Sequence, residues 1–114
     1  MKSLEYYLRL VEYSSIPLMT LMTLYILSGY GMITPLFNII GFTYSTSHKI
    51  HTLPLIRYLT SILTAIHCYC GIIIMTNRRV RNPVLRNVIA YLALLYAALL
   101  TSLTTLAELI LFLT

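Results

Sequence analysis

Five residues with polar, charged or very small side chains recur at helical spacing in the middle of the chain. They are Arg57, Thr60, Thr64, His67 and Gly71, separated by three, four, three and four positions. On a helix of 3.6 residues per turn, this spacing places all five on one face. An imidazole can bind a metal or carry a proton, and a glycine leaves room beside it. This face is therefore a candidate binding surface.

The composition determines the environment in which this face must work. The chain has 114 residues, of which 59% are hydrophobic and only 10% are charged, whereas soluble domains have about 25% charged residues. So few charges cannot cover a water-facing surface, which argues against a soluble enzyme domain, a disordered tail and a disulfide-stapled secreted module. The basic residues bracket apolar segments instead of spreading over a solvated face, so no nucleic-acid partner is expected.

Long stretches without Asp, Glu, Lys or Arg predict three membrane-spanning helices, near residues 13–34, 53–77 and 86–112. A helix needs about 20 apolar residues to cross the hydrocarbon core. Backbone groups in lipid must form hydrogen bonds within their own segment, so the spans should be helical. The predicted fold is a single all-α membrane domain over 1–114, in contact with membrane lipid.

Two segments lie outside these spans. The stretch 34–48 contains Pro35, Asn38 and Gly41, residues typical of a loop or a shallow interfacial segment. The first dozen residues mix apolar and charged types and should extend the first helix into the headgroup region. A cleaved signal peptide is the alternative, which the acidic residues and the absence of a small-residue cleavage site disfavour.

The basic residues are distributed unequally between the two ends of the predicted spans. Six of them fall on one side, Lys2, Arg9, Arg78, Arg79, Arg81 and Arg86, against Lys49 and Arg57 on the other. Cytoplasmic loops carry the excess of Lys and Arg. We therefore expect a cell (inner) membrane protein with its N-terminus and 78–86 loop in the cytoplasm and its C-terminus outside.

His67 lies near the middle of the second predicted span, where a histidine is costly unless it has a partner. One interpretation is axial ligation of a b-type haem, with Gly71 leaving room for the porphyrin. The other ligand would then come from a partner subunit, a second copy, or Met19 or Met22. The alternative is a histidine hydrogen-bonded to a neighbouring helix, with Gly71 permitting close packing.

Glu108 is the only acid within the three predicted spans, and it lies at a depth similar to that of Arg57. The two residues could form an ion pair, which would make both tolerable in a low-dielectric setting. A proton-accepting role of Glu108 near a quinone site is the sharper alternative.

His48 and His51 precede the second span and are either solvated loop residues or functional groups. On an unbroken helix His51 would lie about 160° from His67, so the two could not ligate one iron. His51 would instead hold a second haem or exchange protons. Cys68 and Cys70 point in different directions on a helix, and we interpret them as ordinary buried thiols.

The stretch 60–73, in which His67 is followed by three residues and Gly71, resembles the second helix of the cytochrome b membrane anchor of succinate dehydrogenase. Ser28-Gly29 is similar to the Ser-Gly of that family. Residues 27–31 with the downstream Pro35, His51 and His67 also resemble the b-type cytochrome subunits of formate dehydrogenases and uptake hydrogenases.

These resemblances imply a haem b bound through His67, with quinone as the electron-transfer substrate. The predicted cofactor site comprises His67, Gly71, Thr64, Arg57 and Ser28, with His51 as a further metal ligand. The chain would be a non-catalytic or electron-transfer subunit, bound to other membrane subunits and to a peripheral dehydrogenase-type subunit. Two alternatives remain, a haem-free accessory subunit that packs against larger membrane subunits and a small transporter or channel component.

Overall fold

Three long helices and one compact helical corner make up the structure. The computed structural model describes residues 2–114, with side chains described from residue 4 onward. The elements are α1 (Lys2–Ile33), the 3-10 helix η1 (Pro35–Ile40), α2 (Tyr44–His51), α3 (Pro54–Arg79) and α4 (Pro83–Leu113). No strand occurs among the described residues.

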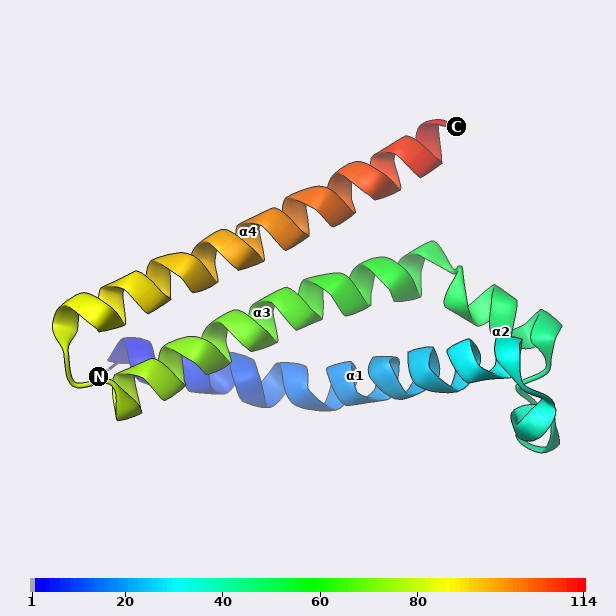
Figure 1. The fold of residues 1–114 in the computed structure, drawn as a ribbon, viewed down its shortest axis with the longest axis horizontal. Helices are drawn as coiled ribbons and strands as arrows, with labels where there is room; N and C mark the ends of the chain where they lie inside the picture. Colours follow the sequence, from blue (N-terminus) through cyan, green and yellow to red (C-terminus); the bar gives the residue numbers. More distant parts are fainter. Residues whose placement is uncertain (1) are drawn as a thin grey trace.

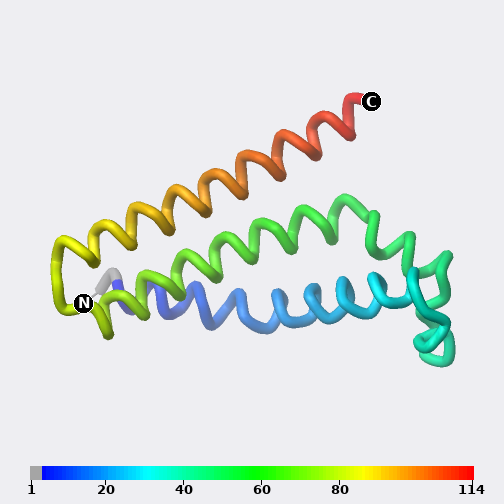
Figure 2. Tube along the Cα trace, in the orientation of Figure 1, coloured from blue at the N-terminus to red at the C-terminus, as the bar shows by residue number. Residues whose placement is uncertain are grey.

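The central helix of the fold is α3. It packs against α1 on one side and α4 on the other, and the described residues give no comparable contact between α1 and α4 (Figure 1). The molecule measures 51 × 34 × 21 Å, which is the shape of a layer of three antiparallel helices. In Figure 2, α1 runs from left to right, α3 returns from right to left, and α4 runs from left to right again.

The prediction of an all-α membrane domain with three spans is confirmed. Three helices are long and apolar enough to cross a membrane, Leu4–Ile33, Pro54–Arg79 and Pro83–Leu113, with mean hydropathies of 1.5, 1.7 and 1.8. The first helix is continuous with the N-terminal residues. The third begins at Pro83 because Asn82 caps it, its side chain accepting a hydrogen bond from the Val84 amide, while Pro83 occupies the first turn, where an N–H is not needed.

The segment after α1 is helical, whereas the sequence favoured a loop or a shallow interfacial segment. The Thr34 side chain caps η1, and Gly41 ends it with a φ of 96°, a left-handed conformation that glycine adopts without strain. Thr43 then caps α2 by accepting a hydrogen bond from the Thr46 amide. These caps fold the corner back along the end of α1, where the buried Ser47 lies against Gly31.

The buried core is small and lies mainly along α3. Its apolar members are Ala65, Cys70, Ile73, Ile74 and Ala93. Most large apolar side chains on α4 remain exposed, and only 6% of its most apolar window is buried. Such surface is stable in lipid or against other membrane helices, so the fold is that of an integral membrane protein.

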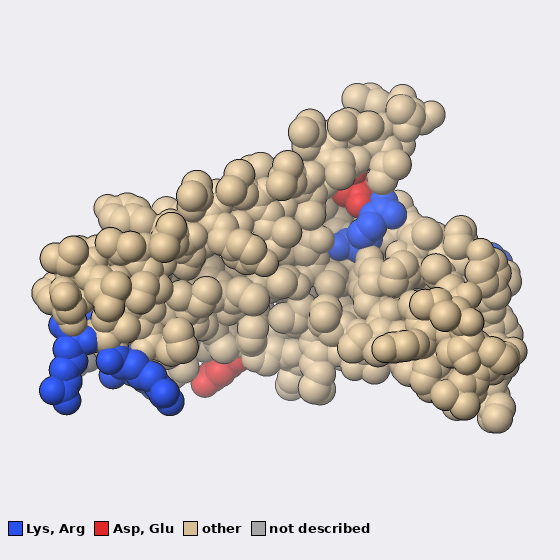
Figure 3. Space-filling model, viewed as in Figure 1, with Lys and Arg blue, Asp and Glu red and all other residues tan. Residues whose placement is uncertain are grey.

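The basic side chains are unevenly distributed along the layer of helices. Basic residues gather at the end where α3 turns into α4, which is also the end that carries the N-terminus (Figure 3). Arg78, Arg79 and Arg81 are exposed there. Arg86 instead closes the turn, donating to the Val80 carbonyl at 2.9 Å.

Candidate functional site

His67 faces α1 and forms a hydrogen bond with it. The Nδ1 atom of His67 lies 3.0 Å from Oγ of Ser14, whose side chain is buried. The single hydroxyl proton of Ser14 is donated to the Val11 carbonyl at 3.2 Å. The contact does not by itself fix the tautomer of His67. With the Ser14 proton on Val11, Ser14 accepts from the Nδ1–H of His67, and the Nε2 atom keeps its lone pair. This is the tautomer that a histidine needs to bind a metal through Nε2.

The surface of α3 beside His67 has open space at Gly71. A Cβ atom built at Gly71 would meet nothing within 4 Å. Close packing of another part of this chain therefore does not account for the glycine. The space is available to a ligand or to a residue of another protein.

Thr64 and Thr60 belong to the same face, but their hydroxyl protons are already used. Thr64 donates to the Thr60 carbonyl at 2.6 Å, and Thr60 donates to the Ile56 carbonyl at 2.7 Å. Such bonds to the preceding turn are ordinary for threonine in membrane helices. Thr64 can therefore contact a ligand, but only as an acceptor or through its methyl group.

Arg57 and Glu108 are brought together at the other end of the layer. Arg57 donates from Nε to Oε1 of Glu108 at 2.5 Å and from Nη2 to Oε2 at 2.9 Å. Its Nη1 donates to the Thr52 carbonyl at 3.2 Å. This two-point pair connects α3 to α4, and the two side chains are 33% and 21% exposed. Because Arg57 lies about 15 Å along α3 from His67, the pair forms a separate polar centre.

Ser28 is placed with His51 and not with His67. Its Oγ lies 3.1 Å from Nδ1 of His51 and donates to the Tyr25 carbonyl, so His51 also keeps the Nε2 lone pair. The Tyr25 ring meets the His51 ring edge-on with centroids 4.8 Å apart. Ser14 and Ser28 are about 21 Å apart along α1, so the two histidines occupy different levels of the molecule.

The helix is broken between the two histidines, because α2 ends at His51 and α3 begins at Pro54. The predicted angle of about 160° on one unbroken helix therefore does not apply. His51 and His67 still cannot ligate one iron, because the serines that they contact are about 21 Å apart along α1. His48 is exposed, whereas His51 is half-buried against α1.

The remaining predicted ligands lie away from His67. Met19 and Met22 are 65% and 43% exposed, and from Ser14 they are rotated about 140° and 80° around α1. Cys68 and Cys70 are free thiols, the second of them buried. Among the described residues no three His, Cys, Asp or Glu side chains cluster as a metal site.

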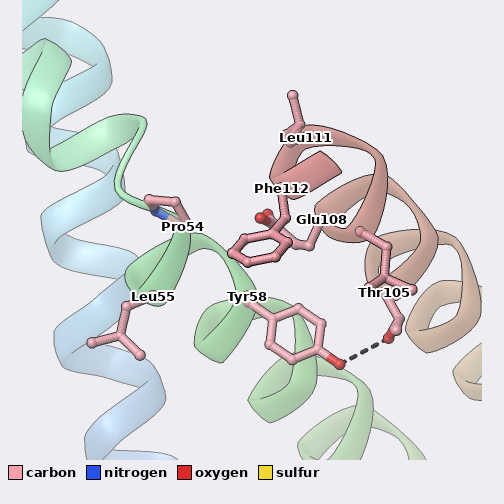
Figure 4. A pocket seen from close by; sticks show the side chains of 8 residues that line it. Pro54, Leu55, Tyr58, Thr105, Glu108, Leu111 and Phe112 are labelled. Atoms are coloured by element: carbon pink, nitrogen blue, oxygen red, sulfur yellow. Dashed lines mark hydrogen bonds between the residues drawn. The ribbon is translucent and has the colours of Figure 1, made fainter. Parts of the chain in front are cut away.

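A cavity lies at the Arg57–Glu108 end, where the sequence left open a quinone site beside Glu108 but did not predict the other lining residues. It measures about 780 Å³ and lies between the start of α3 and the end of α4 (Figure 4). Its lining residues are Pro54, Leu55, Tyr58, Thr105, Glu108, Leu109, Leu111 and Phe112. The Tyr58 hydroxyl forms a 2.8 Å hydrogen bond with the Thr105 hydroxyl across its floor. One signal was available, because Tyr58 follows Arg57 and Thr105 precedes Glu108 by one helical turn.

Comparisons with protein-family models, with curated proteins and with solved structures find no match to this chain. The resemblance to cytochrome b anchors stays a prediction.

Proposed function

We propose that this chain is a membrane-anchor subunit of a redox complex, in which His67 supplies one axial ligand to a b-type haem. The observation that carries the proposal is the Ser14–His67 hydrogen bond, which orients the imidazole and, with the Ser14 proton on Val11, leaves Nε2 as its free ligand atom. When bound, the haem would carry electrons between a peripheral dehydrogenase-type subunit and membrane quinone.

The residues around His67 fit such a group. Ligating histidines usually donate their second ring N–H to a fixed acceptor, which is the part that Ser14 plays here. Gly71, one turn along α3, leaves open space where a flat macrocycle would need it. His67 itself is half-buried, so part of the residue is accessible from outside the chain.

The same geometry requires a second protein. His67 lies on a layer of helices whose faces are open, and neither Met19 nor Met22 is turned toward it. We infer that the haem would lie between this chain and another membrane subunit or a second copy. A peripheral dehydrogenase-type subunit would then dock at one end of the layer.

For the orientation, we propose a cell (inner) membrane location with the basic end in the cytoplasm. The exposed Arg78, Arg79 and Arg81 support this topology, because positive residues are retained on the cytoplasmic side. The C-terminus, at the end of the third span, would then lie outside.

A haem-free accessory subunit is the second candidate, and one observation favours it. The Ser28–His51 contact joins α1 to α2 in the same way as the Ser14–His67 contact joins α1 to α3. Two identical serine–histidine bonds could serve only to hold helices together. In that role the exposed faces of α1 and α4 would pack against larger subunits.

Haem analysis of the native complex tests the first proposal. The complex is purified through an affinity tag on this chain, and its haem b content is measured against the quantity of the chain. We expect one haem b per chain, or one for every two chains if two copies share it, in a complex that also contains a dehydrogenase-type subunit. A fully assembled complex without haem b would overturn the haem assignment and leave the accessory role.

A further inference from the structure

The cavity between the start of α3 and the end of α4 has the features of a ligand site, independently of His67. Its volume of about 780 Å³ falls within the range of small-molecule pockets, about 300–1,000 Å³. Its walls are mostly apolar, and its polar groups converge from both helices (Figure 4). We propose that it binds one neutral membrane lipid that carries a free hydroxyl on its head, of the diacylglycerol class.

The depth of the cavity points to a lipid. Arg57 is three residues from the start of α3, and Glu108 is five residues from the end of α4. At 1.5 Å per residue the polar groups therefore lie about 5–8 Å inside the helix ends, close to the membrane interface. The head of a membrane lipid lies near this level, while its acyl chains extend toward the bilayer centre.

The charges at the site favour a lipid with an uncharged head group. Arg57 already neutralises the Glu108 carboxylate through two hydrogen bonds. An anionic or cationic head would enter this apolar setting without a free counter-charge, which carries a large desolvation cost. A neutral head avoids that cost.

The hydrogen-bonding groups of the cavity favour a ligand that donates a hydrogen bond. A carboxylate oxygen has more than one lone pair, so each oxygen of Glu108 can accept a further bond beside the one from Arg57. A hydroxyl on the ligand can therefore donate to Glu108. The hydroxyls of Tyr58 and Thr105, already paired with one another, supply a second polar contact.

The apolar residues suit acyl chains. Leu111 and Phe112 are 56% and 87% exposed, and Leu109 is 52% exposed. Together with Pro54 and Leu55 they form a wall that is open to the surrounding bilayer. A lipid can enter sideways from the membrane and bury its chain against this wall, a gain of about 0.8 kcal/mol per buried CH₂ group.

Photolabelling tests the proposal with the full-length chain in phosphatidylcholine vesicles. The probe is a diacylglycerol with a diazirine in one acyl chain, and mass spectrometry locates its adducts. We expect adducts to concentrate in 54–58 and 105–112 and to fall at least fivefold with a tenfold excess of unlabelled diacylglycerol. A phosphatidylcholine probe with the same diazirine chain should label the lipid-facing helices without this preference.

Two variants on one helix provide the matched control. Leu109→Trp fills the cavity and should reduce the adducts in 54–58 several-fold. Leu103→Trp places the same ring at another exposed position of α4, where Leu103 is 62% exposed, and should leave them unchanged. The same labelling pattern with both lipid probes, or labelling that survives Leu109→Trp, would overturn the site. Stronger competition by a quinol than by diacylglycerol would overturn the lipid assignment.

Discussion

Oγ of Ser14 lies 3.0 Å from Nδ1 of His67, and this contact joins the first and second membrane helices near the middle of their length. When Ser14 donates to Val11, the proton between the two side chains belongs to the histidine. A hydroxyl on α1 thus determines which imidazole nitrogen on α3 is free. The proposed ligation of haem depends on this relationship.

Replacement of Ser14 by Ala should weaken haem binding without removing the ligand. The Nδ1–H of His67 would lose its acceptor, and loss of such an outer-shell partner typically costs about 10- to 100-fold in metal affinity. Leaving the buried donor without a partner should also destabilise the fold by about 1–3 kcal/mol. Haem retention during a detergent wash measures the first effect, and thermal unfolding measures the second.

Ser28→Ala is the matched control for this experiment. It removes the equivalent acceptor from His51, about 21 Å along α1, and should lower the stability by a similar amount. It should leave the haem at His67 in place. Equal haem loss in both variants would mean that the serines act through helix packing alone.

The Arg57–Glu108 pair should show strong coupling between its two members. Arg57→Leu or Glu108→Leu alone leaves a charge without a partner near the membrane interface and should lower the melting temperature. The double variant removes both charges and should unfold at a higher temperature than either single variant. Melting temperatures in detergent measure this difference. A double variant that melts below both single variants, as two independent losses of stability would produce, would contradict the pairing.

Gly31→Ala should disrupt the corner formed by α1 and α2. The added Cβ would clash with Oγ of Ser47 and lie 3.0 Å from the Phe42 carbonyl oxygen, so the α2 side of the corner must shift. Overpacking of this kind costs about 1–3 kcal/mol. Protease sensitivity of the 34–52 segment should rise, together with a lower melting temperature.

Gly71→Ala provides the control, since a Cβ at that position meets nothing within 4 Å. It should fold as well as the native chain, or slightly better because alanine favours the helix. A Gly31→Ala chain as stable as Gly71→Ala would show that the corner does not pack as described.

The spans could be predicted from the sequence because each requires only length and the absence of charge. The approach of Arg57 to Glu108 could also be anticipated, since two antiparallel helices joined by a short turn bring residues of equal depth together. These inferences use distance along each helix alone. They do not require knowledge of how each helix is rotated about its axis.

The partners of the histidines do depend on that rotation. Ser28 was grouped with His67, but the rotation and register of α1 bring Ser14 to His67 and leave Ser28 for His51. Ser14 was not singled out from the sequence, although the first helix was expected to extend back through the first dozen residues, as α1 does. The helical corner was missed because three short caps, and not hydrophobic periodicity, define it.

The central claim is that Nε2 of His67 ligates a b-type haem. The most direct measurement is a reduced-minus-oxidised absorption spectrum of the assembled complex with His67→Ala, beside the same complex with the exposed His48→Ala. We predict that His67→Ala loses one b-type haem signal while His48→Ala keeps the native spectrum. An assembled His67→Ala complex with an unchanged haem spectrum would contradict the account.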